Sequence, residues 1–511
     1  MKKNPVIFLT LLSILFSLSQ SPATAAAKAG GKCSKAGITS VVSTKTYTCI
    51  KSGKKLVWDK GVSSSSSANK AITFNSFCDP DPLVPAEWKS LQDWGVKYGS
   101  CITQWRYVPG PTNFVAPSQA LTEKSLLKPI DSCKLTNSGN NGYALRGFPL
   151  YQNFTPTKRA NIQVLAVSFK DAPDFDNPTT EHLKEITYFT DTLKNASDVP
   201  INPVVRNVDK YIQLPKNVED YKLYVHQPST KLFAEDVIKA WDAEINFSDV
   251  DYVLIFAPNT LYIQQFNRAI NFQDFRTAEK RVEAVTVAGP LLSDGTNRNA
   301  QYEGNTQNQW LQSMPAALIH EGIYHMLGLD DHLGNESYLD PRNSNPSNWD
   351  ELGTGMWGNM SAMNGELLTW DKWTVGFIAD SQVRCTSSEV TSTHWLRPSS
   401  SKGDFEKLIV VPLSTTKAIV VESRRSTGYN YKYPTSSEGA LVYIVDTTDS
   451  RHSYGVYVKR PLNRPDNRFG NGFSLGDAAL KKGESITLSN VKISVVDSGS
   501  FGDVVKVEKV G

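Results

Sequence analysis

The chain has 511 residues, of which 40% are hydrophobic and 21% are charged, with 33 glycines and 27 prolines. This composition excludes collagen, a long coiled coil and a largely disordered chain, and the length suits about two to four domains. Lysine and arginine number 54 against 51 for aspartate and glutamate. Because the charge is nearly balanced, nucleic acid and anionic membranes are not expected as the main partner.

Residues 1–27 have the pattern of a secretory signal peptide. Lys2 and Lys3 precede an apolar run from Val6 to Leu18, and small residues at 23–25 provide a cleavage site. The apolar run covers about 13 residues, whereas a membrane-spanning helix needs about 20. We therefore expect a secreted protein, extracellular or associated with the cell wall, that is monomeric and has no membrane insertion.

The cysteines agree with an oxidising compartment, where disulfides persist. There are six of them: Cys33, Cys49, Cys78, Cys101, Cys133 and Cys385. The sequence alone does not choose among the pairings. Short loops favour Cys33–Cys49 and Cys78–Cys101, which would leave Cys133–Cys385 as a long-range bond.

Three segments precede the main body of the chain. Residues 28–60 form a small basic module with two cysteines, with strands expected at 44–50 and 55–58. Its lysine-rich face is either a solvated surface or a contact for an anionic cell-wall polymer. Residues 61–71 are a serine-rich linker. Residues 72–155 are either a pro-region or an N-terminal extension of the next domain.

The main body changes from an α/β to an all-β pattern. Residues 161–168 and 251–257 are apolar runs of strand length, and 231–246 between them has helical spacing. Strand, helix and strand indicate an α/β layer in the domain 156–384. Short β runs separated by turn residues follow and predict a β-sandwich over 385–511. These runs are Leu408–Leu413, Ala418–Glu422, Ala440–Val445, Ser485–Leu488, Val491–Val496 and Val504–Val507.

Three of the seven histidines lie in one short segment, SMPAALIHEGIYHMLGLDDH. Ser313 is a plausible helix start and Gly328 a plausible helix end. The expected helix carries His320, Glu321 and His325. A catalytic zinc site uses three imidazole or carboxylate ligands and keeps its fourth position for water. A neighbouring carboxylate can then accept a proton from that water.

The spacing of the two helical histidines is unusual. His320 and His325 are five residues apart, which places them about 140° apart on an ideal α-helix. They can share an ion if the helix contains a π-bulge, which adds one residue to a turn. Gly322 would lower the strain of such a bulge. Alternatively, Tyr324 takes the second ligand position and His325 lies beside the site.

Beyond the helix, His325, Gly328 and Asp331 form the pattern HxxGxxD. Here the sequence resembles the M6 (immune inhibitor A-like) secreted metallopeptidases of the metzincin-like group, with their HExxHxxGLPD motif. Residues 357–361 (WGNMS) and 370–377 (WDKWTVGF) resemble the segments that follow this motif in the family. NIQVLAVSFKD upstream and GALVYIVD downstream resemble its core strands, so the resemblance covers about 156–511.

The resemblance implies an α+β fold: a zincin-like α/β catalytic domain followed by a C-terminal β-sandwich, with the two-cysteine module before them. Carried over by position, it makes His320 and His325 zinc ligands, Glu321 the general base, Asp331 the third ligand and Met360 the methionine beneath the metal. The sequence departs from the family in the extra residue before His325. It also has Asp330 where the family has proline. Dipeptidyl peptidase III-like zinc enzymes have a similar HExxxH spacing.

The residues leave several alternatives open. His332 is an alternative third ligand, and Tyr324 is a candidate donor to the oxyanion. Asp171, Asp174 and Asp176 form either a polar loop or a structural Ca²⁺ site. We expect a secreted zinc endopeptidase that cleaves extracellular proteins or peptides. The alternative is an inactive protein of the same fold that serves as an extracellular binding module.

Overall fold

The computed structural model describes residues 28–36, 39–42, 45–60, 62–63, 107–137, 146–156, 158–172, 177–223, 230–258, 269–272, 274–288, 318–332, 354, 357–358, 365–433, 435–449, 455–461 and 475–511. Met1–Asn69 and Lys70–Gly511 are two compact units, and their boundary falls within the predicted serine-rich linker. Several predictions lie outside the described residues. They concern the signal peptide at 1–27, the Cys78–Cys101 bond, Met360, and Asp174 and Asp176 of the calcium alternative.

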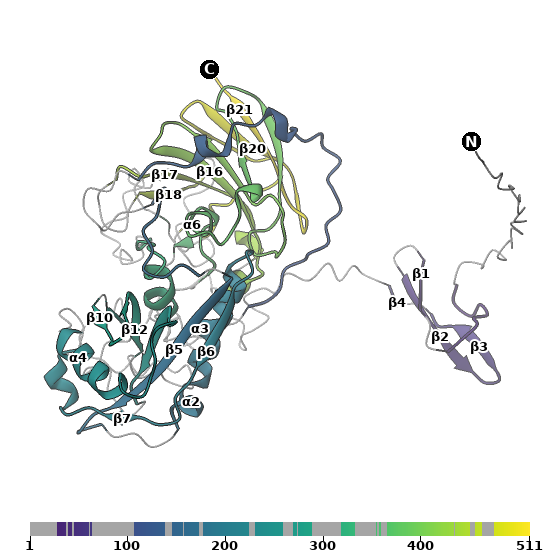
Figure 1. Cartoon of the computed structure of the whole chain (residues 1–511). Helices are drawn as coiled ribbons and strands as arrows, with labels where there is room; N and C mark the ends of the chain where they lie inside the picture. The colour runs from purple at the N-terminus through teal and green to yellow at the C-terminus, as the bar shows by residue number, and fades with distance from the viewer. Residues whose placement is uncertain are drawn as a thin grey trace, which may run out of the picture. The chain divides into compact units, whose positions relative to one another are not determined.

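The first unit contains a small antiparallel sheet (Figure 1). Its strands are β1 (Thr39–Val42), β2 (Lys45–Ser52), β3 (Lys55–Trp58) and β4 (Val62–Ser63). A disulfide joins Cys33 to Cys49, as predicted, and Cys49 is buried. A module this small has little core of its own, so the bond is a main source of its stability.

The second unit begins with a six-stranded sheet in the order β6-β5-β8-β12-β9, with β7 beside β5. All pairings are parallel except that of β9, which runs antiparallel to β12. The strands are β5 (Arg159–Ser168), β6 (Asn202–Arg206), β7 (Ile212–Gln213), β8 (Tyr252–Phe256), β9 (Ala269–Phe272) and β12 (Ala284–Ala288). A separate hairpin consists of β10 (Phe275–Arg276) and β11 (Arg281–Val282).

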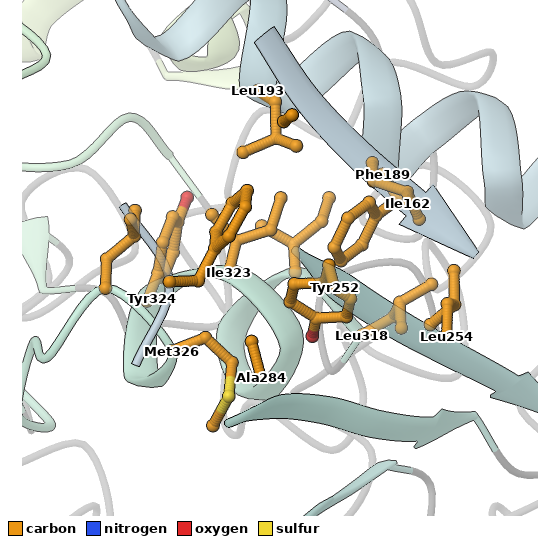
Figure 2. Packing of buried hydrophobic residues seen from close by; sticks show 14 of the residues in the cluster. Ile162, Phe189, Leu193, Tyr252, Leu254, Ala284, Leu318, Ile323, Tyr324 and Met326 are labelled. Atoms are coloured by element: carbon orange, nitrogen blue, oxygen red, sulfur yellow. The ribbon is translucent and has the colours of Figure 1, made fainter. Parts of the chain in front are cut away.

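Helices cover both faces of this sheet, which is why β5 and β8 consist mostly of apolar residues. On one face lies α4 (Thr230–Trp241), and on the other lie α2 (Pro178–Glu181), α3 (Leu183–Ala196) and the helical turn η6 (His320–His325) (Figure 1). Alternate residues of β8 and β12 belong to the two cores. Figure 2 shows the core on the η6 side.

The predicted helix over 231–246 is present but ends earlier, at Trp241. The indole N–H of Trp241 donates to the carbonyl of Ala166 in β5, which fixes this end of α4 to the sheet. Further along, the side chain of Asn246 accepts the N–H of Ser248, a local turn that competes with helix.

The C-terminal part consists of two sheets that share a core of aliphatic side chains, as in a β-sandwich. One sheet has the order β13-β15-β16-β17-β18 and the other β14-β21-β20-β19. All six predicted β runs are confirmed, while β13, β14 and β18 were not predicted. The strands are β13 (Val383–Cys385), β14 (Ser392–Leu396), β15 (Leu408–Pro412), β16 (Lys417–Arg424), β17 (Gly439–Asp446), β18 (Val456–Lys459), β19 (Ser485–Leu488), β20 (Val491–Gly499) and β21 (Gly502–Lys509).

The outer face of the five-stranded sheet is also buried. Trp370 and Trp373 of α6 (Thr369–Thr374) pack on it. Short 3-10 turns connect the larger elements: η2 (Lys124–Leu126), η3 (Ile130–Cys133), η4 (Val218–Tyr221), η11 (Asp380–Gln382), η12 (Tyr429–Lys432) and η13 (Thr435–Ser437). Within the part of the chain that the structure describes, no helix has both the length and the apolar character needed to cross a membrane.

Residues 107–137 and 146–156, which we call the N-terminal strap, are integrated into the second unit. The predicted disulfide between Cys133 and Cys385 ties the strap to β13. Val108 pairs with Gly428 through two backbone hydrogen bonds, and the N–H of Phe154 donates to the carbonyl of Met326. The described part of 72–155 therefore packs on the same unit as the sheets that follow it.

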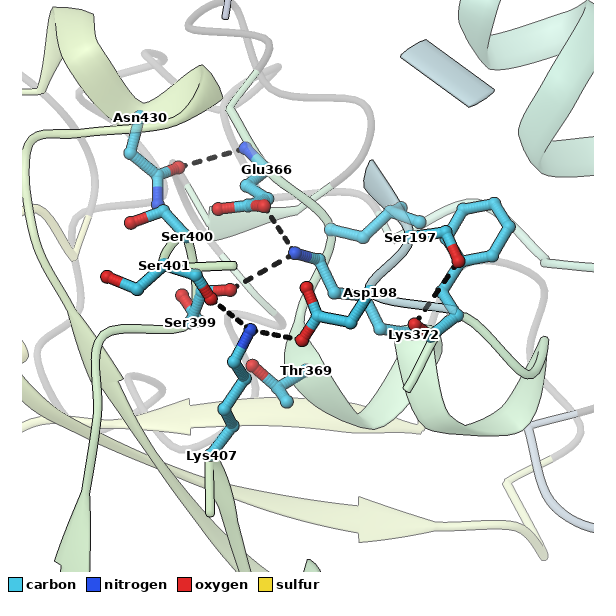
Figure 3. Close-up of polar contacts among 12 residues, drawn as sticks. Ser197, Asp198, Glu366, Thr369, Lys372, Ser399, Ser400, Ser401, Lys407 and Asn430 are labelled. Carbon is cyan, nitrogen blue, oxygen red and sulfur yellow. Dashed lines mark hydrogen bonds and ion pairs between the residues drawn. The ribbon is translucent and has the colours of Figure 1, made fainter. Parts of the chain in front are cut away.

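Buried charges connect the α/β layer to the sandwich (Figure 3). Lys407, just before β15, contacts the carboxylate of Asp198, which follows α3, and the carbonyl of Ser401. Lys372 of α6 contacts Glu366 and the carbonyl of Ser399. Both lysines are buried and paired, so breaking either pair would leave an uncompensated charge. These contacts hold the two layers in one arrangement.

Candidate metal centre

The segment with the histidine cluster contains the distorted turn that the spacing predicts. His320–His325 is a π-helix, preceded by α-helical residues 318 and 319. The segment ends in a Schellman motif at Gly328, in which the N–H of Leu329 donates to the carbonyl of Tyr324 over 3.0 Å and that of Gly328 to the carbonyl of His325 over 2.9 Å. The extra residue therefore turns the side chain of His325 back towards that of His320, and their ring centroids are 4.4 Å apart.

Gly328 ends the segment and turns the chain back towards the histidines. Its φ of +84° lies in the left-handed region that favours glycine. A Cβ atom here would lie 2.0 Å from the carbonyl oxygen of Tyr151 in the strap. Only glycine fits this position, and the turn returns Asp331 to the face of the helix that carries His320 and His325.

Three side chains meet at one point. Oδ1 of Asp331 lies 2.9 Å from Nε2 of His320 and 3.2 Å from Nε2 of His325. One ligand atom from each of His320, Glu321 and His325 also lies within 4.8 Å of the other two. Two imidazole nitrogens and a carboxylate oxygen that share one point are a typical ligand set for catalytic zinc. The residues present therefore fit a zinc ion.

The second ring nitrogen, Nδ1, has different surroundings in His325 and in His320. Nδ1 of His325 donates to the carbonyl oxygen of Leu329 over 2.8 Å. This bond leaves Nε2 for a ligand role, as a backbone carbonyl does for many metal-bound histidines. His320 is buried, and its Nδ1 has no hydrogen-bond partner among the described residues. A buried nitrogen without a protein partner typically forms a hydrogen bond with a water molecule.

His325 carries a proton when no metal is bound, and its Nε2 faces the carboxylate of Asp331. Burial alone raises the pKa of Asp331, but hydrogen bonds from His320 and His325 hold it well below its usual range. Burial alone lowers the pKa of His325, whereas Asp331 and Glu321 raise it, and the result is a pKa of about 9. A cation placed among these groups would replace that proton, so metal binding should release it.

Glu321 is held beside the cluster by a residue that the sequence analysis did not identify. The side-chain N–H₂ of Asn271 in β9 donates to Oε2 of Glu321 over 3.1 Å and to its backbone carbonyl over 2.9 Å. The carboxylate thus points from the first turn of the π-helix towards the edge of the sheet. Asn271 lies fifty residues away in the sequence and follows no recognisable motif.

The alternative third ligand lies elsewhere. Nε2 of His332 is 3.0 Å from Oδ1 of Asp371 in α6, and both side chains are buried. The neighbouring Asp330 pairs with Arg146 of the strap. Of the two residues considered for the third position, the structure therefore brings Asp331 to His320 and His325 and places His332 against α6.

Two other predicted roles gain no support from the geometry. Tyr324 is buried in the apolar core beside Ile323 and Met326 (Figure 2), and burial raises its pKa well above the usual value. This placement favours a packing role over that of ligand or oxyanion donor. For the calcium alternative, the one described residue is Asp171, whose carboxylate accepts the N–H of Val218.

Comparison with known proteins adds nothing to this geometry. No model of a known protein family matches the chain, and no curated protein matches it. The chemistry of the site has to be judged from its residues. These are two imidazoles and a carboxylate that converge, a donor set suited to a borderline cation such as zinc, with the carboxylate of Glu321 at their side.

Proposed function

We propose that this protein is a secreted zinc endopeptidase with His320, His325 and Asp331 as metal ligands. The convergence of these three side chains across the π-helix is the observation that carries the proposal. The resemblance of the segment to M6-like metallopeptidases supports it. A sheet with an antiparallel edge strand, packed against the ligand-bearing helix, also fits a zincin-like catalytic domain.

Glu321 is the general base of the proposed reaction. Bound zinc would polarise the scissile carbonyl and lower the pKa of a water molecule towards about 7. Glu321 would take the proton of that water and return it to the leaving amine. By donating to Oε2, Asn271 holds the carboxylate of Glu321 in one orientation, so this side chain needs little reorientation before it accepts the proton.

The edge strand β9 suggests how a polypeptide binds. Within the described ranges, β12 is the one strand that pairs with β9, and it does so along a single edge. An extended peptide can add to the other edge through main-chain hydrogen bonds. Because Asn271 of β9 contacts Glu321, a peptide bound there would run past the general base.

The N-terminal module supports an extracellular role. Residues 28–63 contain eight lysines and one acidic residue, Asp59. We propose that this module contacts an anionic cell-wall polymer. Charge reversal at the exposed Lys51, Lys54 and Lys55 should lower retention on such a polymer at low salt and leave peptidase activity unchanged. Equal retention of the variant and the wild type would argue against the contact.

The inactive binding module is the rival function, and the extra residue in HEGIYH is the sequence feature that points to it. The π-helix accommodates that residue, so this feature no longer favours the rival. The test is zinc quantification in the purified protein, with casein or gelatin hydrolysis measured with and without a chelator. About one zinc per chain and chelator-sensitive hydrolysis support the enzyme. Zinc without hydrolysis, or no zinc, would support the binding module.

A further inference from the structure

The extra residue of the π-helix changes the partner of one carbonyl group. In an α-helix the carbonyl of Gly322 would accept the N–H four residues later, that of Met326. Here the N–H groups of Met326 and Leu327 both donate to the carbonyl of Ile323. The carbonyl of Gly322 instead accepts the hydroxyl of Tyr252 over 2.6 Å.

Tyr252 is built into this position. It lies in β8, its ring is fully buried, and Figure 2 shows it beside the ring of Phe189. A Cβ atom at position 322 would lie 3.1 Å from the hydroxyl oxygen of Tyr252 and 3.0 Å from Phe189. The absence of a side chain at Gly322 therefore permits this close approach. Burial raises the pKa of Tyr252, so its hydroxyl stays a donor.

The polar contacts continue across the sheet to Glu321. The hydroxyl of Tyr252 contacts that of Thr286 in β12. Thr286 donates over 2.7 Å to Oδ1 of Asn271, its direct neighbour in the register of β12 with β9. Asn271 in turn donates to Glu321. Three adjacent strands thus supply a chain of polar side chains that begins and ends on the π-helix.

We propose that Tyr252, Thr286 and Asn271 are positioning residues with separable tasks. Tyr252 fixes the π-turn that brings His320 and His325 to one ion, Asn271 orients Glu321, and Thr286 holds Asn271 through the hydrogen bond that it donates to Oδ1. This inference rests on the proposed function. If these residues served packing alone, we would not expect the hydroxyl of Tyr252 to donate to the carbonyl of Gly322, or the amide of Asn271 to donate to the carboxylate of Glu321.

The first experiment measures zinc affinity by competition with a chelator in the full-length protein. Tyr252→Phe keeps the ring and removes the donor to Gly322, and it should weaken zinc binding by about tenfold to a hundredfold, as outer-shell changes do. The spectrum of the cobalt-substituted variant should also change. The control is Tyr221→Phe, which removes a buried hydroxyl bonded to Asp236 in the core on the opposite face of the sheet.

The second experiment separates catalysis from metal binding. Asn271→Leu should keep the wild-type zinc affinity while kcat falls by about tenfold or more, with little change in KM. Thr286→Val removes the hydrogen bond to Oδ1 of Asn271, so it should lower kcat as Asn271→Leu does, and Thr286→Ser, which keeps the hydroxyl, should not. If Tyr252→Phe does not fold, the kcat values of Asn271→Leu, Thr286→Val and Thr286→Ser still test the proposal, and equal kcat in all three and in the wild type would overturn it.

The outcomes distinguish the two levels of the proposal. A wild-type protein that binds no zinc would overturn the proposed function and this inference together. A zinc-binding wild type in which Tyr252→Phe and Tyr221→Phe have equal affinity would overturn the inference alone. The inference would also be overturned if the variants lowered the melting temperature and changed neither the zinc affinity nor kcat.

Discussion

Arg146 of the N-terminal strap and Asp330 of the loop after η6 form a buried ion pair. Nη2 of Arg146 lies 2.6 Å from Oδ2 of Asp330, and the side chains are 1% and 5% exposed. Nη1 of Arg146 also donates to the carbonyl of Asp449. Because Asp330 directly precedes Asp331, the strap supports the loop that carries the third candidate ligand. Asp330, which stands where the similar HExxHxxGLPD motif has proline, therefore anchors this loop to the strap.

Removing Arg146 should destabilise the protein strongly. Arg146→Leu would leave Asp330 buried without its charged partner, a change that typically costs about 3–5 kcal/mol. The double variant with Asp330→Leu should recover most of this loss, because neither charge then remains. The free energy of unfolding in urea measures the effect.

A matched control is Arg206→Leu, since Arg206 pairs with Asp249 at the surface. That exposed pair should contribute less than about 1 kcal/mol. If Arg146→Leu and Arg206→Leu cost the same, the ion pair with Asp330 has no special role in supporting the loop.

Glu321 should be needed for catalysis and dispensable for metal binding. Glu321→Gln keeps the shape of the side chain and can no longer accept the proton, so activity should fall by about a hundredfold or more. Zinc content should stay at the wild-type level. Glu235→Gln, an exposed change on α4, serves as the control, and full activity of the Glu321 variant would show that the role is wrongly assigned.

The neighbouring residues Asp331 and His332 should respond differently. Asp331→Ala removes a carboxylate that contacts both histidines, so zinc affinity should fall by more than the tenfold to hundredfold of an outer-shell change. His332→Asn should lower stability through its lost contact with Asp371 and largely retain zinc. Chelator competition and thermal unfolding of both variants measure this. The reverse order of zinc affinities would make His332 the ligand.

A strand or helix could be predicted where one continuous stretch of sequence has the residue pattern of that element. The strands β5 and β8 are buried on both faces, so most of their residues are apolar, with VLAV at 164–167 in β5 and YVLIF in β8. The π-turn was predicted from the spacing of His320 and His325, because two histidines five residues apart share a face only if a turn contains one extra residue. The strand β14 was missed because its sequence, STHWL, mixes polar and apolar residues.

The supporting residues were not predictable because they lie far away in the sequence. Arg146 is separated from Asp330 by 184 residues and Tyr252 from Gly322 by 70. Such pairs arise from the packing of the strap and of β8 against the site, which no local pattern encodes. The choice between Asp331 and His332 likewise depends on the path of the chain after Gly328.

His182 offers a test of pH dependence outside the candidate centre. Tyr211 donates its hydroxyl proton to Glu181, so Nε2 of His182 donates to the tyrosine oxygen over 2.7 Å. The ring stacks on Phe256, and its Nδ1 is buried without a hydrogen-bond partner within the described ranges. Protonation of Nδ1 would bury an unpaired charge, and burial accordingly lowers the pKa of His182 to about 3.

The lowered pKa of His182 determines how the free energy of unfolding changes with pH. Between about pH 6.5 and pH 3 the unfolded chain binds a proton at His182 and the folded protein does not, so stability falls as the pH falls. The contribution is at most about 1.4 kcal/mol per pH unit. In His182→Gln, whose amide can still donate to Tyr211, the free energy of unfolding should fall less steeply between pH 6.5 and pH 4.5. Urea titrations of both proteins across this range measure the difference, and parallel pH profiles would mean that His182 is not buried in its neutral form.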